Sequence, residues 1–136
     1  MILNVEVKQM LRIKIIFNPA AGKGDDYEKI DDLALQLLDR NYTVSLFKTE
    51  KSYDANHEAC KASQSNDWDL IISAGGDGTL NEIINGILCS GSKINLAVYP
   101  LGTMNDFGKF LNISKDPYVL ANRIEEGKYS LVDVGK

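Results

Sequence analysis

Segments with the pattern of buried strands alternate along this chain with segments that repeat apolar residues at helical spacing. The segment 69–74 (DLIISA) is the clearest strand, because its centre is continuously apolar, as expected when helices cover both faces of a sheet. The segment 26–40 is the clearest helix, and Asp25 or Asp26 can cap its start. The pattern predicts further strands at 11–17, 42–47, 94–99 and 129–134, and further helices at 53–63, 80–88 and 118–126.

Such alternation is typical of βαβ units built around a mostly parallel sheet. Because the crossover connections are right-handed, helices cover both faces, and we expect an α/β fold, a three-layer sandwich around that sheet. Ligands bind such sheets at the carboxyl ends of the strands, where the loops converge. The 136 residues of the chain fit one domain with one buried core.

Composition excludes several classes of protein. The net charge of -4, from 15 basic and 19 acidic side chains, argues against a nucleic-acid module, which usually carries a basic stripe. Cys60 and Cys89 are too few for a disulfide scaffold, and no cluster of cysteine and histidine offers a metal site. Glu6 and Lys8 interrupt the N-terminal segment, which lacks the apolar run of a signal peptide. No stretch is long enough to span a bilayer, so we expect a cytoplasmic protein.

The most informative segment follows the clearest strand and precedes a helix. It contains Gly75, Gly76 and Gly78, whose missing side chains let backbone N–H groups approach an anion closely. The start of the helix adds unsatisfied donors, so a phosphate is the natural ligand, and Thr79 can cap the helix or bond a phosphate oxygen. Asp77 suits a ligand that carries Mg²⁺ or a hydroxyl that must be oriented or deprotonated. The alternative is a tight turn in which Asp77 only caps the helix.

Three further polar segments follow predicted strands. Residues 18–24 (NPAAGKG) leave backbone amides accessible, and Lys23 can reach a phosphate, although neither a Walker loop nor a dinucleotide-binding G-x-G-x-x-G is present. Thr49 follows the second strand, and Thr103 and Asn105 lie in the turn after the fourth. Because the carboxyl ends of parallel strands meet at one rim of the sheet, these segments together predict a shared nucleotide site.

These residues resemble the diacylglycerol kinase catalytic domain family, which includes bacterial lipid kinases and the sphingosine and ceramide kinases. The Gly-Gly-Asp-Gly core alone is not decisive, since NAD kinases and phosphofructokinases use similar loops. The resemblance extends from Arg12 onward and consists of Asn18-Pro-Ala-Ala-Gly22, Thr49, Gly75-Gly-Asp-Gly-Thr-Leu-Asn81 with Glu82, and Pro100-Leu-Gly-Thr-Met-Asn-Asp106.

The resemblance implies ATP as the nucleotide and Mg²⁺ as its cation, with the metal ligands left open. Asp77 would be the catalytic residue near the phosphates and metal, and Glu82 would support the loops. Met104 stands where many relatives have a small residue. The residues assigned to ATP binding are Asn18, Pro19, Ala20, Ala21, Gly22, Thr49, Gly75, Gly76, Asp77, Gly78, Thr79, Leu80, Asn81, Thr103 and Asn105.

The resemblance also implies a second, mostly β-sandwich domain that follows this one and carries acceptor-binding surface. We therefore expect an N-terminal extension at 1–10, the nucleotide-binding domain at 11–128, and the start of the second domain at 129–136, so that this chain alone is inactive. The implied reaction transfers the γ-phosphate of ATP to a lipid hydroxyl, with a diacylglycerol-like acceptor. It further implies transient contact with the inner membrane surface, and a homodimer is compatible with it. The alternatives are an NAD kinase-like phosphotransferase and a non-catalytic nucleotide-binding module.

Overall fold

The computed structural model describes residues 10–101 and 114–127. Within them, parallel strands form one sheet in the order β2-β1-β3-β4. The strands are β1 (Arg12–Phe17), β2 (Thr43–Lys48), β3 (Leu70–Gly75) and β4 (Asn95–Pro100). The helices are α1 (Asp26–Asp39), α2 (Asp54–Gln64), α3 (Asp77–Ser90) and α5 (Pro117–Glu126), and a short 3₁₀ helix, η1 (Pro19–Ala21), follows β1.

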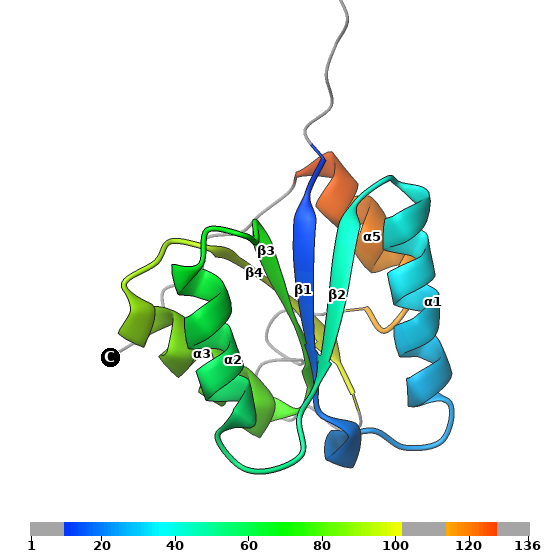
Figure 1. Cartoon of the computed structure of the whole chain (residues 1–136). Helices are drawn as coiled ribbons and strands as arrows, with labels where there is room; N and C mark the ends of the chain where they lie inside the picture. The colour runs from blue at the N-terminus through cyan, green and yellow to red at the C-terminus, as the bar shows by residue number, and fades with distance from the viewer. Residues whose placement is uncertain (1–9, 102–113, 128–136) are drawn as a thin grey trace, which may run out of the picture.

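The sheet lies between two layers of helices. Helices α1 and α5 cover one face and α2 and α3 cover the other, which confirms the predicted three-layer α/β sandwich (Figure 1). The chain leaves β1 toward β2 on one side, whereas it leaves β3 toward β4 on the other side. The carboxyl ends of β1 and β3 therefore form a topological switch point, which is where open parallel sheets bind ligands.

Each face of the sheet buries its own apolar cluster. Along β1, Ile13, Ile15 and Phe17 pack toward α1 and α5, whereas Ile16 packs toward α2 and α3, as the two-residue period of a strand requires. The larger cluster consists of Ile13, Ile15, Phe17, Ile30, Leu33, Leu37, Leu70, Ile72, Ala74, Tyr99, Leu101, Leu120, Ala121 and Ile124. The smaller cluster consists of Ile16, Ala55, Ala59, Ala62, Ile71 and Ile83.

The predicted elements are confirmed, apart from the expected strand at 129–134, which lies outside the described residues. Helix α3 begins at Asp77 rather than at residue 80, because Gly76 is extended and serves as its N-cap. The prediction that Asp25 or Asp26 caps the start of α1 through its side chain is wrong. Asp25 occupies the N-cap position but makes no capping hydrogen bond, and the carboxylate of Asp26 accepts from Lys23 N at 2.8 Å, upstream of the helix.

In the described parts of the chain, none of the helices combines the length and the apolar character that crossing a bilayer requires.

Helices α2 and α3 approach each other closely at Gly86. A Cβ atom at this position would meet the carbonyl oxygen of Asn56 and would lie 3.0 Å from the Cβ of Ala59 and 3.1 Å from Cys60 N. These obstacles are mostly backbone, which cannot rotate away. The absence of a side chain at Gly86 therefore sets the distance between the two helices.

We expect Gly86→Ala to lower the free energy of unfolding by about 1–3 kcal/mol, because the helices must separate to admit the methyl group. The neighbouring Asn85→Ala is the matched control, since Asn85 is exposed on the same helix and gains only helix propensity. Urea denaturation of both variants measures the difference. Equal stability of the two variants would contradict the tight contact.

Tyr99 connects β4 to the segment that precedes α5. Its ring is fully buried, and its hydroxyl donates to the carbonyl oxygen of Lys115 at 2.6 Å. Burial, reinforced by the negative charges of Asp26 and Asp116, raises the pKa of Tyr99 to about 12. The folded state therefore holds this proton at a pH where an exposed tyrosine loses it.

Because the pKa of Tyr99 is higher in the folded chain, its contribution to stability is complete below pH 10 and is lost as the pH rises through 12. We expect the free energy of unfolding to fall by up to about 2 kcal/mol over this interval on account of Tyr99. We expect Tyr99→Phe to be about 1 kcal/mol less stable than the wild type at neutral pH, and its free energy of unfolding to fall less than that of the wild type between pH 10 and 12. Parallel urea titrations would show this difference, and identical pH profiles would refute it.

Candidate functional site

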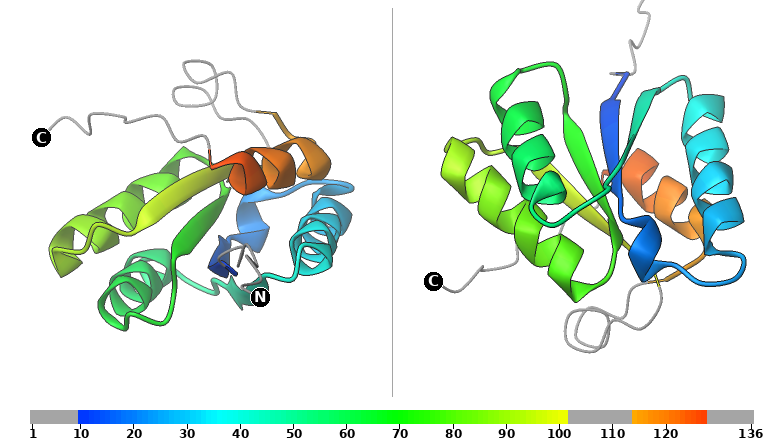
Figure 2. Two further views of the ribbon diagram at one scale, coloured as in Figure 1. Left: turned by 90° about the horizontal axis from the view of Figure 1, so that it is seen from above. Right: turned by 60° about the horizontal axis from the view of Figure 1, so that its bottom comes forward.

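The loops that follow the strands all begin at one rim of the sheet. The right view of Figure 2 turns this rim toward the reader. Three backbone hydrogen bonds, each 2.9 Å long, continue the sheet beyond its strands. Thr49 N donates to Phe17 O, Asn18 N to Ala74 O, and Leu101 N to Gly75 O. The starting points of four loops are thus fixed relative to one another.

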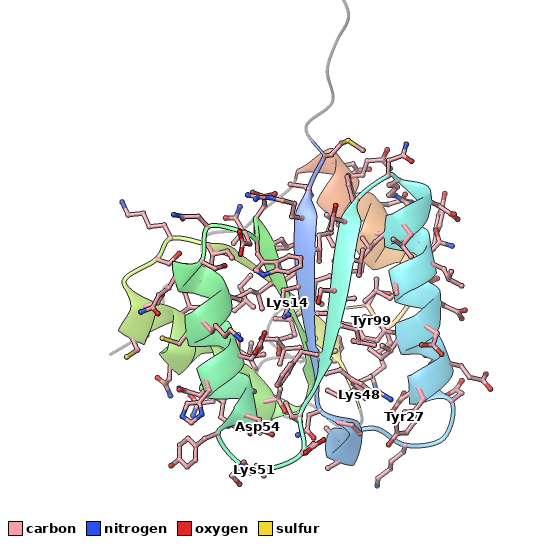
Figure 3. The ribbon with its side chains drawn as sticks, in the orientation of Figure 1. Lys14, Tyr27, Lys48, Lys51, Asp54 and Tyr99 are labelled. Carbon is pink, nitrogen blue, oxygen red and sulfur yellow. The ribbon has the colours of Figure 1, made fainter. Side chains whose placement is uncertain are left out.

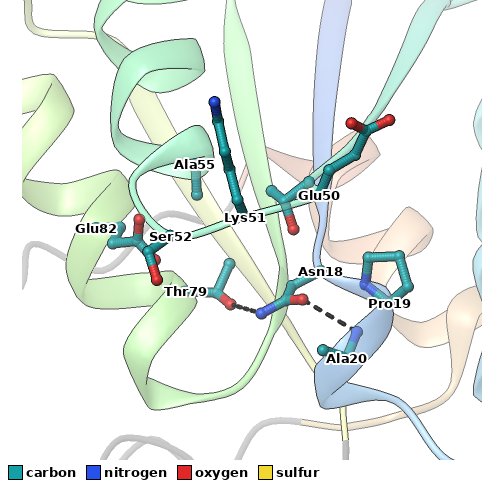
Figure 4. Close-up of a pocket in the computed structure, with 10 residues that line it drawn as sticks. Asn18, Pro19, Ala20, Glu50, Lys51, Ser52, Ala55, Thr79 and Glu82 are labelled. Atoms are coloured by element: carbon teal, nitrogen blue, oxygen red, sulfur yellow. Dashed lines mark hydrogen bonds between the residues drawn. The ribbon is translucent and has the colours of Figure 1, made fainter.

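A pocket of about 390 Å³ opens at this rim (Figure 4). Its walls come from the turn after β1, the loop after β2, and the first turns of α2 and α3. The residues that line it are Asn18, Pro19, Ala20, Thr49, Glu50, Lys51, Ser52, Ala55, Thr79 and Glu82. Three of the strand-end segments that the sequence singles out therefore meet at one cavity.

Asn18 joins two of these walls. Its Oδ1 accepts from Ala20 N at 3.0 Å, which caps η1, and its Nδ2 donates to Thr79 Oγ1 at 3.0 Å (Figure 4). Pro19 follows at the first position of η1, where a missing N–H costs nothing and the fixed φ favours the turn. The Asn-Pro pair thus positions the turn after β1 against α3.

Thr79 takes a different role from the capping role that the sequence allows. It lies inside α3, it is buried, and its hydroxyl accepts from Asn18, so the capping interpretation is wrong. Glycine at position 75 leaves the space that the Thr79 side chain occupies, because a Cβ at Gly75 would lie 2.7 Å from both Cβ and Oγ1 of Thr79. Glycine at 75 is therefore required by the packing of Thr79, whereas a Cβ at Gly76 would make only an ordinary contact with Ala21 on the turn after β1.

The loop after β2 is ordered by one carboxylate. Asp54 Oδ2 accepts from Glu50 N at 2.8 Å and from Lys51 N at 3.0 Å. These backbone hydrogen bonds hold the pKa of the Asp54 carboxyl below its usual value. Tyr53, immediately before α2, has a left-handed backbone with φ of 71°. The chain therefore turns sharply into α2 and places the loop along the pocket.

Glu82 lines the pocket, and one of its two carboxylate oxygens is buried. Its Oε1 is inaccessible to solvent and accepts no hydrogen bond from the described residues. Because the Glu82 side chain lies on the wall and a carboxylate only accepts hydrogen bonds, the pocket suits a ligand that offers a hydroxyl or an amino group. The resemblance assigns Glu82 only a supporting role, whereas the structure places it on the wall itself.

Five of the predicted ATP contacts line the pocket, namely Asn18, Pro19, Ala20, Thr49 and Thr79. Ala21, Gly22, Gly75, Gly76, Asp77 and Gly78 lie on the adjoining turns, Leu80 is buried and Asn81 is exposed. Thr103 and Asn105 lie outside the described residues. The contacts of these residues with ATP stay predictions. The sequence did not indicate Glu50, Lys51, Ser52 or Ala55, although the polar run that follows Thr49 is the signal that could have found the first three.

Acidic side chains available for a metal are few in the described residues, which contain no group of three or more aspartate, glutamate, histidine or cysteine residues placed to hold an ion. Asp77, at the first position of α3, and Glu82 on the pocket wall are the carboxylates of this helix near the rim. Magnesium usually takes one or two carboxylates and completes its shell with phosphate oxygens and water. The donor set therefore fits Mg²⁺ that arrives with a nucleotide.

Known proteins are similar to this chain in sequence and in structure. Among curated proteins, diacylglycerol kinases from Staphylococcus aureus strains bovine RF122 / ET3-1 and MRSA252 are each 42% identical over 125 residues, which is 92% of this chain and 39% of each relative. The crystal structure of a diacylglycerol kinase from Bacillus anthracis str. Sterne superposes with a TM-score of 0.75 and 28% identity, covering 90% of this chain and 44% of that one.

The chain thus spans less than half the length of these relatives. The family model of the diacylglycerol kinase catalytic domain matches residues 12–136, which include every strand and helix described above. The fold, the order of the motifs and the strand-end pocket agree with that match, and the chain belongs to the diacylglycerol kinase catalytic domain family.

Proposed function

We propose that this chain is the ATP-binding part of a Mg²⁺-dependent kinase that transfers the γ-phosphate of ATP to the hydroxyl of a diacylglycerol-like lipid. The observation that carries the proposal is the meeting of three strand-end segments around one pocket, joined by the hydrogen bond between Asn18 and Thr79. Membership of the family supports lipid as the acceptor. Contact with a membrane surface follows from such an acceptor, and the cytoplasmic location and homodimer stay predictions.

In this proposal the pocket binds the nucleoside of ATP, and the start of α3 binds its phosphates. Glu82 accepts from a hydroxyl or an amino group of the nucleoside, because its carboxylate lies on the pocket wall. The backbone amides at Gly76 and Gly78 receive the phosphates at the positive end of α3, where a Cβ would meet little or nothing. The nucleoside thus lies in the cavity and the phosphates extend toward Asp77.

We assign to Asp77 the action on the transferred phosphate. This aspartate is the first residue of α3 and directly follows the glycine pair at the end of β3. In the transfer, the acceptor oxygen forms a bond to the γ-phosphorus while the bond from that phosphorus to the β–γ bridging oxygen breaks, leaving ADP, and the hydroxyl proton passes to a carboxylate or to water. Asp77 orients the acceptor hydroxyl or the magnesium that neutralises the developing charge.

The reaction is tested with protein expressed from its complete gene, because the relatives are longer than the matched region. With radiolabelled ATP, Mg²⁺ and diacylglycerol vesicles we expect a labelled phospholipid, and with NAD in place of lipid no labelled product. Asp77→Asn is expected to lower kcat by about 10²-fold or more, because it removes the carboxylate from the reacting centre.

Asp67→Asn is the control for this experiment, since Asp67 is exposed and precedes β3, away from the pocket. Labelling of NAD instead of lipid would favour an NAD kinase-like enzyme. Nucleotide binding without transfer to either acceptor would favour a non-catalytic module. Near wild-type kcat in Asp77→Asn would contradict the role given to Asp77.

A pair of glycine variants tests whether the contact at Thr79 shapes the ATP site. Gly75→Ala pushes Thr79 away from Asn18, and we expect about 1–3 kcal/mol lower stability and at least about tenfold weaker ATP binding. Gly78→Ala meets nothing within 4 Å and favours the helix, so stability is unchanged or higher. Isothermal titration with ATP and Mg²⁺ compares Gly75→Ala with the wild type, and Gly78→Ala serves as the control for stability alone, because Gly78 belongs to the proposed phosphate site. Equal affinity in Gly75→Ala and the wild type would show that the contact does not shape the site.

A further inference from the structure

A lysine lies among apolar residues on the face of the sheet that α2 covers. Lys14 stands in the middle of β1, with Ile13 and Ile15 fully buried on either side. Its side chain is only 13% exposed and projects toward α2 (Figure 3). A charged group so little exposed needs a partner, since burying an isolated ammonium is costly.

The partners of Lys14 come from three other elements. Its Nζ lies 3.0 Å from Glu58 Oε1 on α2, and the Glu58 side chain is 12% exposed. The same Nζ donates to Ser45 Oγ on β2 at 3.2 Å. It also lies 5.1 Å from the ring centroid of Trp68 and 6.0 Å from that of Phe47. The ammonium is therefore held by a carboxylate, a hydroxyl and two aromatic rings.

The buried apolar residues of α2 are Ala55, Ala59 and Ala62, whose short side chains give little directional contact with the sheet. The contact of α2 with α3 is set separately, by the close approach at Gly86 and by the hydrogen bond from Asn56 Nδ2 to Glu82 O at 3.3 Å. The ion pair between Lys14 and Glu58 is a directional contact, unlike contacts between methyl groups, and it can fix the position of α2 relative to β1. Burial of such a pair often adds little net stability, whereas fixing one arrangement of packed elements is its best-attested use.

The position of α2 matters to the pocket, because the start of this helix is part of the wall. Ala55 and the preceding Ser52 line the cavity. Glu58 follows Ala55 by three residues, so the two side chains lie on the same side of the helix, one turn apart. A shift of α2 along β1 would therefore move the pocket wall by the same amount.

We propose that Lys14 and Glu58 are positioning residues for the pocket, whose ion pair fixes α2 against β1 and so fixes the wall formed by Ser52 and Ala55. The inference deepens the proposed function, since it takes ATP with Mg²⁺ as the ligand of that wall. Neither residue touches the ligand, and each acts through α2.

The test replaces both charges together with apolar side chains of similar size, Lys14→Met with Glu58→Leu. We expect the urea midpoint to stay the same or rise, because no charge is left buried without a partner. We expect ATP affinity to fall about tenfold and amide exchange at residues 52–55 to become faster, because α2 loses its fixed position. If the ion pair served stability alone, a double variant with the wild-type urea midpoint would also bind ATP with wild-type affinity.

Trp68 provides a direct readout, because it is the single tryptophan of the chain and contacts the Lys14 ammonium. In the wild type we expect ATP to change the emission of Trp68 through α2, and in the double variant we expect no change. Arg12→Met with Asp69→Asn is the matched control, since that ion pair, at 3.0 Å, also involves β1 but lies at the end remote from the pocket. This control should bind ATP with wild-type affinity.

Wild-type ATP affinity together with unchanged amide exchange in the double variant would overturn the proposal. If the double variant does not fold, Glu58→Gln replaces it, with a smaller loss of affinity expected because an acceptor for Lys14 is kept. If the wild type itself does not bind ATP, the proposed function fails, and amide exchange at residues 52–55 alone decides whether the ion pair fixes α2.

Discussion

The parallel pairing of β1 with β3 is the constraint on which the pocket depends. The register places Phe17 opposite Ala74, and the next hydrogen bond, from Asn18 N to Ala74 O, holds the turn after β1 beside the end of β3. Only then can the Asn18 side chain reach Thr79, one helical turn into α3. A slip of one residue would turn Asn18 to the opposite face of the sheet and separate the two walls.

The same pairing explains why glycine is needed at the end of β3. The chain must leave the strand and begin α3 at once, with Thr79 close against the backbone of Gly75. Any side chain at 75 would occupy the space of Thr79, whereas Gly78 faces open space. Two glycines of this turn therefore differ in their surroundings: Gly75 permits packing inside the protein, and Gly78 borders open space, where the proposed phosphates would lie.

The strands and helices could be predicted because their signals are local, as in the continuous apolar centre of β3 and the helical spacing of Ile30, Leu33 and Leu37. The turn after β1 and the Gly-Gly-Asp-Gly turn were also predicted, since glycine and proline mark them directly. Of the wall from the loop after β2 only Thr49 was predicted, because the course of the following residues depends on hydrogen bonds of Asp54 to backbone groups. The ion pair of Lys14 was not predicted, because Glu58 is distant in sequence and reaches Lys14 only through the packing of α2.

The charges around the pocket bear on the form in which the proposed nucleotide would bind. Among the described residues, Glu50, Glu82 and Lys51 line the pocket, Asp77 lies beside it at the start of α3, and Lys23 follows on the turn after β1. A bare triphosphate would be repelled by these carboxylates, and the amides at the start of α3 provide only about half a positive charge. A divalent cation that travels with the phosphates reverses this balance, because the same carboxylates then attract the complex or hold the ion through water. An acidic pocket beside a glycine turn is therefore consistent with phosphate binding, provided that the ligand brings its own cation.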